Sequence, residues 1–176
     1  IDATANNNYT GLTEFLNGDR AVAGELTLGA NRIGFGETGA APAGILLDPT
    51  DLAALQGLDS LSLSSYTSFD FYGGVAVGGL GADGRPLLGK LTLNGASLTG
   101  LDNPGQMASL RARELTLINT ATAATTPPPV QPALAESALN IVAEKLVLGT
   151  GSKTVSGFAS VDIAAREIVV VVTRHP

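Results

Sequence analysis

Four aspartates of this 176-residue chain are candidates for acid–base chemistry: Asp48, Asp59, Asp70 and Asp162. Cleavage of a polysaccharide needs clustered carboxylates, one acting as general acid and another as base or nucleophile. Each of these aspartates stands alone, with no paired-Asp, Gly-His-Gly or Arg-x-Lys element nearby. The sole histidine, His175, lies one residue from the end, which argues against a Ser-His-Asp triad. We therefore expect that the protein is not an enzyme.

A metal site or cofactor is not expected either. The stretch GGLGAD, from Gly78 to Asp83, matches the opening of a glycine-rich nonapeptide that binds Ca²⁺ between stacked turns. That mechanism needs tandem copies and a large apolar residue where this chain has Arg85. A single imperfect copy favours a plain loop. The absence of cysteine excludes disulfides, zinc–thiolate sites, iron–sulfur clusters and thiol catalysis.

Aromatic residues concentrate in one stretch, SSYTSFDFYGG at 64–74. Strand alternation places Phe69 and Phe71 inward, with Asp70 on the opposite face. Tyr66, Asp70 and Tyr72 therefore form a candidate outward patch for contacting a protein or a sugar. The alternative is that the two tyrosines wedge a predicted helix at 50–56 against the body of the protein.

Composition and charge restrict the partners and the core. A net charge of −6 should repel nucleic-acid phosphates and anionic lipid headgroups, and no apolar run approaches the length of a membrane-spanning helix. The chain is 44% apolar but only 5% aromatic, so Leu, Val, Ile and Ala must form the core. Its length fits one domain over 1–176, which we interpret as a fragment of a larger protein.

A repeated phrase indicates how these residues are positioned. LRARELTL (110–117), IVAEKLVL (141–148) and IAAREIVV (163–170) share one pattern, ending in an apolar-x-apolar triplet. Six such triplets begin at Leu26, Leu61, Leu91, Leu115, Leu146 and Ile168. Period-two alternation indicates short strands, and recurrence every 22 to 35 residues indicates a coil that returns to one register. The six residues should then stack in one interior column, with Leu28, Leu63, Leu93, Leu117, Leu148 and Val170 in the next.

The longer intervals contain insertions. Residues 48–57 predict a short helix capped by Thr50 or Asp51, 78–86 a turn-rich loop, and 120–132 an extended surface loop. Residues 132–149 could instead form an amphipathic helix, so strand and helix both stay open there. The pattern predicts an all-β fold, a parallel β-helix of about six turns, ahead of an antiparallel sandwich.

The Gly/Ala/Leu/Thr-rich units over about 25–120 resemble the shaft of filamentous haemagglutinin-type exoproteins, the two-partner-secretion adhesins of Gram-negative bacteria. LDPTDLAALQGLDSLSLSSYTSFDFYG (47–73) carries the most specific similarity. The resemblance implies a right-handed β-helix, an outer-membrane secretion partner, a secreted or outer-membrane-associated location, and attachment to a surface protein or carbohydrate of a host or neighbouring cell. The alternative is a β-helix module that binds or cleaves extracellular polysaccharide.

The end of the repeat region predicts one further contact. REIVVVV (166–172) loses its alternation, and the last strand of a stack exposes an unpaired apolar edge. We expect either a capping loop or self-association through that edge.

Overall fold

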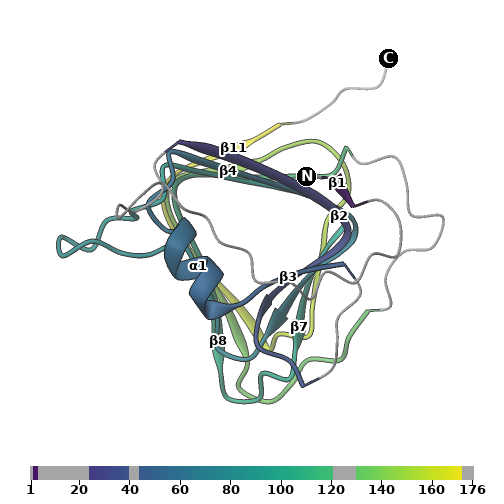
Figure 1. Ribbon diagram of the computed structural model, residues 1–176. Coiled ribbons are helices and arrows are strands. Elements are labelled where there is room, and N and C mark those ends of the chain that lie inside the picture. Colours follow the sequence, from purple (N-terminus) through teal and green to yellow (C-terminus); the bar gives the residue numbers. More distant parts are fainter. Residues whose placement is uncertain (1, 4–23, 40–43, 121–129, 172–176) are drawn as a thin grey trace.

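The computed structural model describes residues 2–3, 24–39, 44–120 and 130–171 (Figure 1). Within these ranges the chain forms an 11-stranded sheet and one short helix. Every pair of strands is parallel, and the one antiparallel contact is an isolated bridge between Leu80 and Pro86. The prediction of an all-β protein with parallel strands is confirmed. The elements are β1 (Asp2–Ala3), β2 (Glu25–Gly36), β3 (Ile45–Leu47), α1 (Pro49–Leu55), β4 (Ser60–Tyr72), β5 (Ala76–Val77), β6 (Lys90–Asn94), β7 (Ser97–Leu101), β8 (Met107–Ile118), β9 (Ala138–Leu148), β10 (Thr154–Ser156) and β11 (Ser160–Val170).

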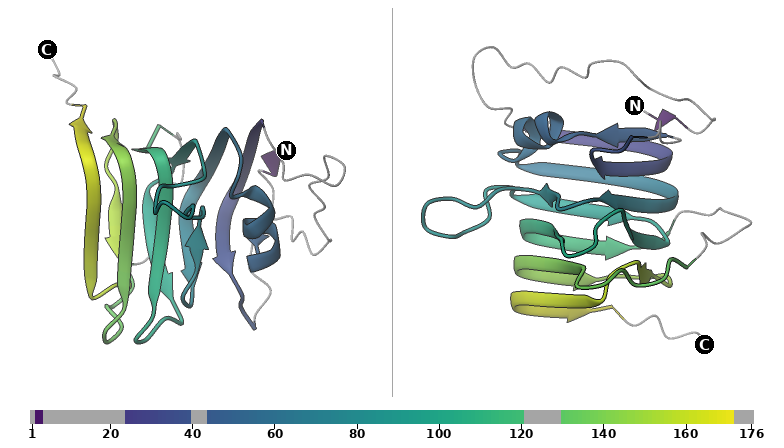
Figure 2. Two further views of the ribbon diagram at one scale, coloured as in Figure 1. Left: turned by 90° about the vertical axis from the view of Figure 1, so that its left-hand side faces the viewer. Right: turned by 90° about the horizontal axis from the view of Figure 1, so that it is seen from below.

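The predicted stacking register is present. Strands β2, β4, β6, β8, β9 and β11 lie side by side in that order, as Figure 2 shows. Their registers join Leu26, Leu61, Leu91, Leu115, Leu146 and Ile168 as successive neighbours, and they join the second predicted column in the same way. The prediction that all six lie in the interior is wrong at the ends, because in the described ranges the strand segments at Leu26 and Ile168 pair on one edge only and leave the apolar face open. Leu26 is half-buried and Ile168 is 53% exposed.

The sheet bends so that three sides surround an apolar interior. Strand β4 shows the bend: residues 60–64 pair with β6, whereas 69–72 pair with β7. Strands β8, β9 and β11 make a similar bend, where one residue is left out of each register. Figure 1 looks along the stack and shows β4 and β11 on one side, β3 and β7 on another, and α1 with β8 on the third. Phe69 and Phe71 are fully buried inside, as predicted.

Helix α1 forms where the sequence predicts a helix, but its cap is different. The N-cap is Asp48, whose carboxylate accepts hydrogen bonds from the backbone N–H groups of Thr50 (2.7 Å) and Asp51 (2.9 Å). The Asp51 carboxylate accepts one in return from the Asp48 N–H at 3.3 Å, which completes a capping box. Asp48 rather than Thr50 or Asp51 therefore begins the helix, since Pro49 is suited to the first helical position. Leu52 and Leu55 anchor the helix in the core.

The region at 132–149 is a strand, so the helical alternative is wrong. Residues 138–148 form β9, which pairs in register with β8 on one edge and with β11 on the other. Two neighbouring strands satisfy its backbone hydrogen bonds, and this tertiary pairing overrides a local helical pattern. The insertion at 78–86 is a loop, tied to β9 by an ion pair between Arg85 and Glu144. Most of the predicted loop at 120–132 lies outside the described residues.

Candidate functional site

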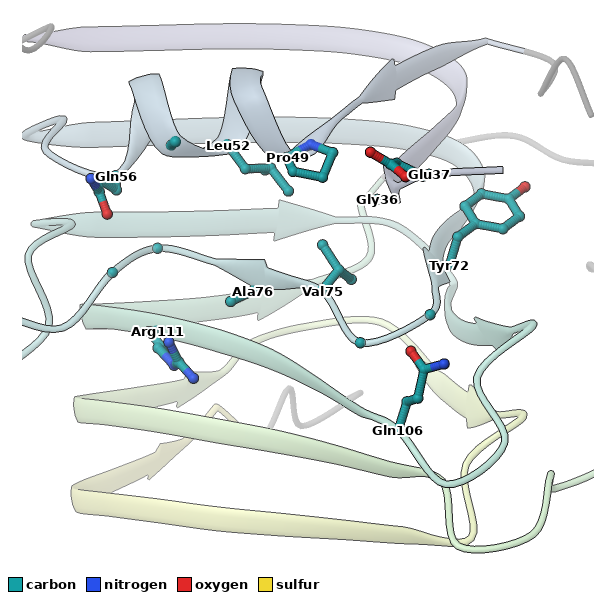
Figure 3. A pocket seen from close by; sticks show the side chains of 15 residues that line it. Gly36, Glu37, Pro49, Leu52, Gln56, Tyr72, Val75, Ala76, Gln106 and Arg111 are labelled. Atoms are coloured by element: carbon teal, nitrogen blue, oxygen red, sulfur yellow. The ribbon is translucent and has the colours of Figure 1, made fainter. Parts of the chain in front are cut away.

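A groove of about 570 Å³ lies on the third side of the molecule (Figure 3). Helix α1 forms one wall with Pro49 and Leu52, together with Gln56 just after the helix. Strand β8 forms the other wall with Arg111, together with Gln106 just before the strand. The floor is the segment 73–79, which contains β5. Strand β5 has only two residues, so most of the floor is irregular backbone. Helix α1 leaves this floor partly uncovered. The inserted helix therefore creates the groove.

Close packing in the floor depends on glycine. Gly78 has a φ of +84°, and a Cβ atom there would overlap the carbonyl oxygen of Arg111. A Cβ on Gly79 would overlap the side-chain oxygen of Gln56 in the same way. The Gln106 side-chain oxygen lies 3.1 Å from the corresponding positions on Gly73 and Gly74. The glycine pairs on either side of β5 thus let side chains from both walls approach the floor.

Polar side chains lie at both ends of this groove. Figure 3 shows Tyr72 and Glu37 at one end, and Arg111 at the other end below Ala76. The guanidinium of Arg111 donates a long hydrogen bond of 3.4 Å from Nη2 to the Ser109 hydroxyl, and its buried Nε has no hydrogen-bond partner. No carboxylate among the described residues forms an ion pair with Arg111. A half-buried guanidinium with unused donors is suited to a carboxylate-bearing ligand.

Three residues are predicted to form a patch. Tyr72 lines the groove, whereas Asp70 lies near Tyr72 and is buried. Asp70 is only 2% exposed, and its Oδ2 lies 3.3 Å from Nε of Arg32. The expectation that Asp70 faces solvent is wrong, although the strand alternation is right. The residue paired with Asp70 in β2 is Gly34, which has no side chain, and the Tyr72 ring lies over it. The outer face of the sheet is therefore covered at this point.

Tyr66 does not share this location. It is half-exposed at the bend of β4, where the side chains of Ser65 and Thr67 donate hydrogen bonds to the Asn31 carbonyl oxygen. Tyr66 is not among the residues that line the groove. The structure thus brings Tyr72, Asp70 and Arg32 together and leaves Tyr66 apart.

The remaining candidate acids are dispersed. Asp48 caps α1, and Asp59 and Asp162 are exposed on separate segments. Asp83 accepts a hydrogen bond from the Arg85 backbone N–H within the 78–86 loop. In the described part of the chain, no three His, Asp or Glu side chains are grouped as metal ligands would be. His175 lies outside the described residues.

Burial sets the electrostatics of the Asp70 cluster. Burial raises the pKa of Asp70 above its ordinary value, although the Ser68 hydroxyl and the Arg32 guanidinium both lower it. Burial also raises the pKa of Tyr72, and the nearby Asp70 carboxylate adds to the effect. The charged form of Asp70 is therefore less favourable in the folded protein than in the unfolded chain.

Replacing Asp70 with asparagine should change how stability depends on pH. Because the folded-state pKa lies above the unfolded value, the folded protein binds the proton more tightly, and Asp70 loses its stabilising effect as pH rises through that interval. From about pH 4 to about pH 7, the wild-type chain should lose stability relative to Asp70→Asn. Urea unfolding midpoints at both pH values measure this. If the wild-type chain became more stable relative to Asp70→Asn as pH rises, the raised pKa of Asp70 would be contradicted.

Comparison with known proteins does not place the chain in a family. Comparisons with protein-family models, curated proteins and solved structures found no match. In the described ranges, no helix combines the length and the apolar character needed to cross a membrane. The strand register and the groove are therefore the features that bear on function.

Sequence reasoning missed most of the groove. Arg111, Gln106, Gln56 and Glu37 were not candidates, because they are far apart in the sequence and belong to no motif. One signal was available in the sequence. The glycine pairs 73–74 and 78–79 enclose a three-residue apolar segment, a pattern typical of close backbone approach.

Proposed function

We propose that the chain is a right-handed parallel β-helix of about six turns. It serves as a segment of the shaft of a secreted or outer-membrane-associated bacterial exoprotein of the filamentous haemagglutinin type. In this proposal the chain is structural and not catalytic. The whole exoprotein crosses the outer membrane with a dedicated partner and attaches to a surface protein or carbohydrate on a host or neighbouring cell. The shaft holds the binding surfaces away from the cell.

The observation that carries this proposal is the unbroken parallel register from β2 to β11. A parallel register that returns at each repeat is the arrangement expected of a solenoid, and crossovers between parallel strands are nearly always right-handed. The column facing outward between the two leucine columns also supports a spacer role. It contains Thr27, Ser62, Thr92, Thr116, Val147 and Val169. Small residues of this kind offer little for a ligand to recognise.

Deleting one repeat tests the proposal. Ala112 and Ala143 are register partners, so deletion of 112–142 joins Arg111 to Ala143 and removes one whole turn. We expect this variant to fold with cooperative unfolding, because turns of a shaft are interchangeable. The deletion places Lys145 next to Lys90, an exposed repulsion that costs less than about 1 kcal/mol. Cells that display the exoprotein with this deletion should attach as well as wild-type cells, as counted by microscopy on host-cell monolayers.

The matched control is deletion of 112–143, which removes one more residue. It moves every following side chain of that strand to the opposite face, so the apolar residues turn outward and the protein should not fold. Loss of attachment at a normal surface level of the 112–142 deletion would overturn the shaft proposal. Circular dichroism and urea unfolding of the purified chains check the folding of both variants.

The groove supports a second candidate function, the binding of extracellular polysaccharide. The specific observation is the Arg111 guanidinium, which has no carboxylate partner among the described residues and shares its groove with Tyr72. An aromatic ring can stack on a sugar while the guanidinium binds the carboxylate of an acidic unit. Calorimetric titration with uronate-containing oligosaccharides distinguishes the two functions. Binding that Arg111→Gln abolishes would favour this module over the shaft, and release of reducing ends would indicate cleavage.

A further inference from the structure

The groove between α1 and β8 carries opposite charges at its two ends (Figure 3). Arg111 lies at one end, and Glu37 lies with Tyr72 at the other. Among the described residues, no acidic group forms an ion pair with Arg111, and no basic group forms one with Glu37. Both side chains therefore keep their charge available to a ligand. A ligand that matches the groove is anionic at one end and cationic at the other.

The end of the groove at Tyr72 stays negative when its buried ion pair is counted. Burial raises the pKa of the Tyr72 hydroxyl most strongly, and the carboxylates of Asp70 and Asp102 raise it further. Arg32 lowers that pKa, but its guanidinium already contacts the Asp70 carboxylate at 3.3 Å. Glu37 and Asp102 are both exposed, so their charges remain beside the groove without compensation from Arg32. This end therefore favours a cation.

The floor between the two ends presents backbone groups that no described strand uses. The Ser109 N–H donates a hydrogen bond to the Val75 carbonyl oxygen at 2.7 Å, and β5 pairs with β8 alone. Successive residues of a strand point their backbone groups to opposite edges, so the N–H and C=O groups of Ala76 point away from β8. In Figure 3 that direction is the side of α1, where the groove lies. A ligand thus meets one donor and one acceptor at the centre of the floor.

Uncharged amides complete the walls. Gln56 and Gln106 are both exposed and both line the groove. A side-chain amide and a peptide group each donate and accept hydrogen bonds, and so does a hydroxyl group. A ligand rich in hydroxyl groups therefore matches the centre of the groove. An extended peptide matches it less well, because β5 offers an edge of only two residues.

We propose that this groove binds a zwitterionic polysaccharide, in which uronate units alternate with amino sugars that carry a free ammonium group. The uronate carboxylate binds the Arg111 guanidinium, whose fork geometry suits a carboxylate. The amino sugar lies at the other end, where its ring stacks on Tyr72 and its ammonium group contacts Glu37. This inference rests on the second candidate function, polysaccharide binding, and specifies the chemical class of the polysaccharide.

A polysaccharide that is acidic throughout fits the groove less well. It would place a carboxylate beside Glu37, where like charges repel each other. The net charge of −6 also opposes the approach of a uniformly acidic polymer. An ammonium group on every second unit removes both obstacles.

The test compares two tetrasaccharides that differ only in their amino sugars. The first alternates glucuronate with glucosamine and carries free ammonium groups. The second has the same units with N-acetyl groups, which are neutral. Calorimetric titration of the full chain at low salt should show the first binding about five-fold more tightly, because only its ammonium group can pair with Glu37 and the Tyr72 ring. The preference should shrink at about 1 M salt, where such exposed charges are screened.

Variants of the chain locate the two ends of the ligand. Glutamine keeps the shape of glutamate without its charge, so Glu37→Gln should bind both tetrasaccharides with about equal affinity. Glu25→Gln is the matched control and should keep the wild-type preference, because Glu25 is also exposed but does not line the groove. Arg111→Gln should weaken the binding of both. An unchanged preference in a folded Glu37→Gln chain would place the amino sugar elsewhere and refute the inference.

The wild-type affinities distinguish failure of this inference from failure of polysaccharide binding itself. Equal affinity for the two tetrasaccharides, or tighter binding of oligouronates than of either, would overturn the zwitterionic class and leave polysaccharide binding in place. No binding of any of these oligosaccharides would overturn both. Tight binding of a blocked Glu-Ser-Lys peptide in their place would make a peptide the ligand and would equally refute the inference.

Discussion

Replacing Leu91 with alanine should lower the free energy of unfolding by about 3 kcal/mol, within the range for fully buried leucines. Leu91 is completely buried and lies between Leu61 and Leu115 in the first column. Truncation removes apolar contacts with both neighbours and leaves a cavity, because strands paired on both edges cannot close around it. Urea unfolding followed by circular dichroism measures the change.

Ile168→Ala provides the matched control. Ile168 belongs to the same column but is 53% exposed, so its truncation should cost less than about 1 kcal/mol. A second control, Thr92→Ala, changes the outward neighbour of Leu91 and should have an effect within about 0.5 kcal/mol. Similar losses for Leu91→Ala and Ile168→Ala would show that the column is not buried as described.

Gly78→Ala should be the most damaging small change on the surface of the groove, costing at least about 2 kcal/mol. Two causes add together. The residue has a φ of +84°, which disfavours any side chain, and the new Cβ would overlap the Arg111 carbonyl oxygen. To relieve that overlap, the floor of the groove must move away from β8. The free energy of unfolding, again from urea titration, reports the loss.

Gly84→Ala separates these two causes. Gly84 lies in the same loop with a φ of +76°, but nothing lies within 4 Å of the position that its Cβ would take. Replacing Gly84 with alanine should therefore cost only the strain of a side chain at positive φ, about 1 kcal/mol. If the two alanine variants were equally stable, close approach of Gly78 to β8 would not be a constraint on the fold.

The strand register could be predicted because it depends on a repeated local pattern. Each triplet supplies the same inward leucines, so equivalent positions align whatever the length of the insertion between them. Even the strand at 138–148, whose helical pattern left two interpretations open, takes the register of its neighbours. The intrinsic preferences of a short segment are weak compared with pairing on both edges.

The candidate site could not be predicted in the same way. Burial of Asp70 depends on Gly34, which lies 36 positions earlier in the chain and leaves room for the Tyr72 ring. The groove depends on how far α1 extends over a two-residue strand. Neither property repeats along the sequence, and both arise from contacts between segments that carry no common motif. A pattern of period two reports which face a side chain takes, but not what covers that face.

At the bend of the sheet, β8 carries Arg113-Glu114, β9 carries Glu144-Lys145 and β11 carries Arg166-Glu167. This alternation of charge has a consequence for how the chain folds. Strands β8, β9 and β11 have similar sequences, so a wrong strand pairing is possible during folding. Strand β11 could pair directly with β8, because their apolar residues match in position. That misthreaded arrangement would place Arg166 on Arg113 and Glu167 on Glu114, whereas the correct order interposes Glu144 and Lys145. The like charges would thus destabilise the wrong pairing of β11 with β8. The opposite charges on neighbouring strands stabilise the observed order β8-β9-β11. Strands with nearly the same sequence can in this way still assemble in the correct order.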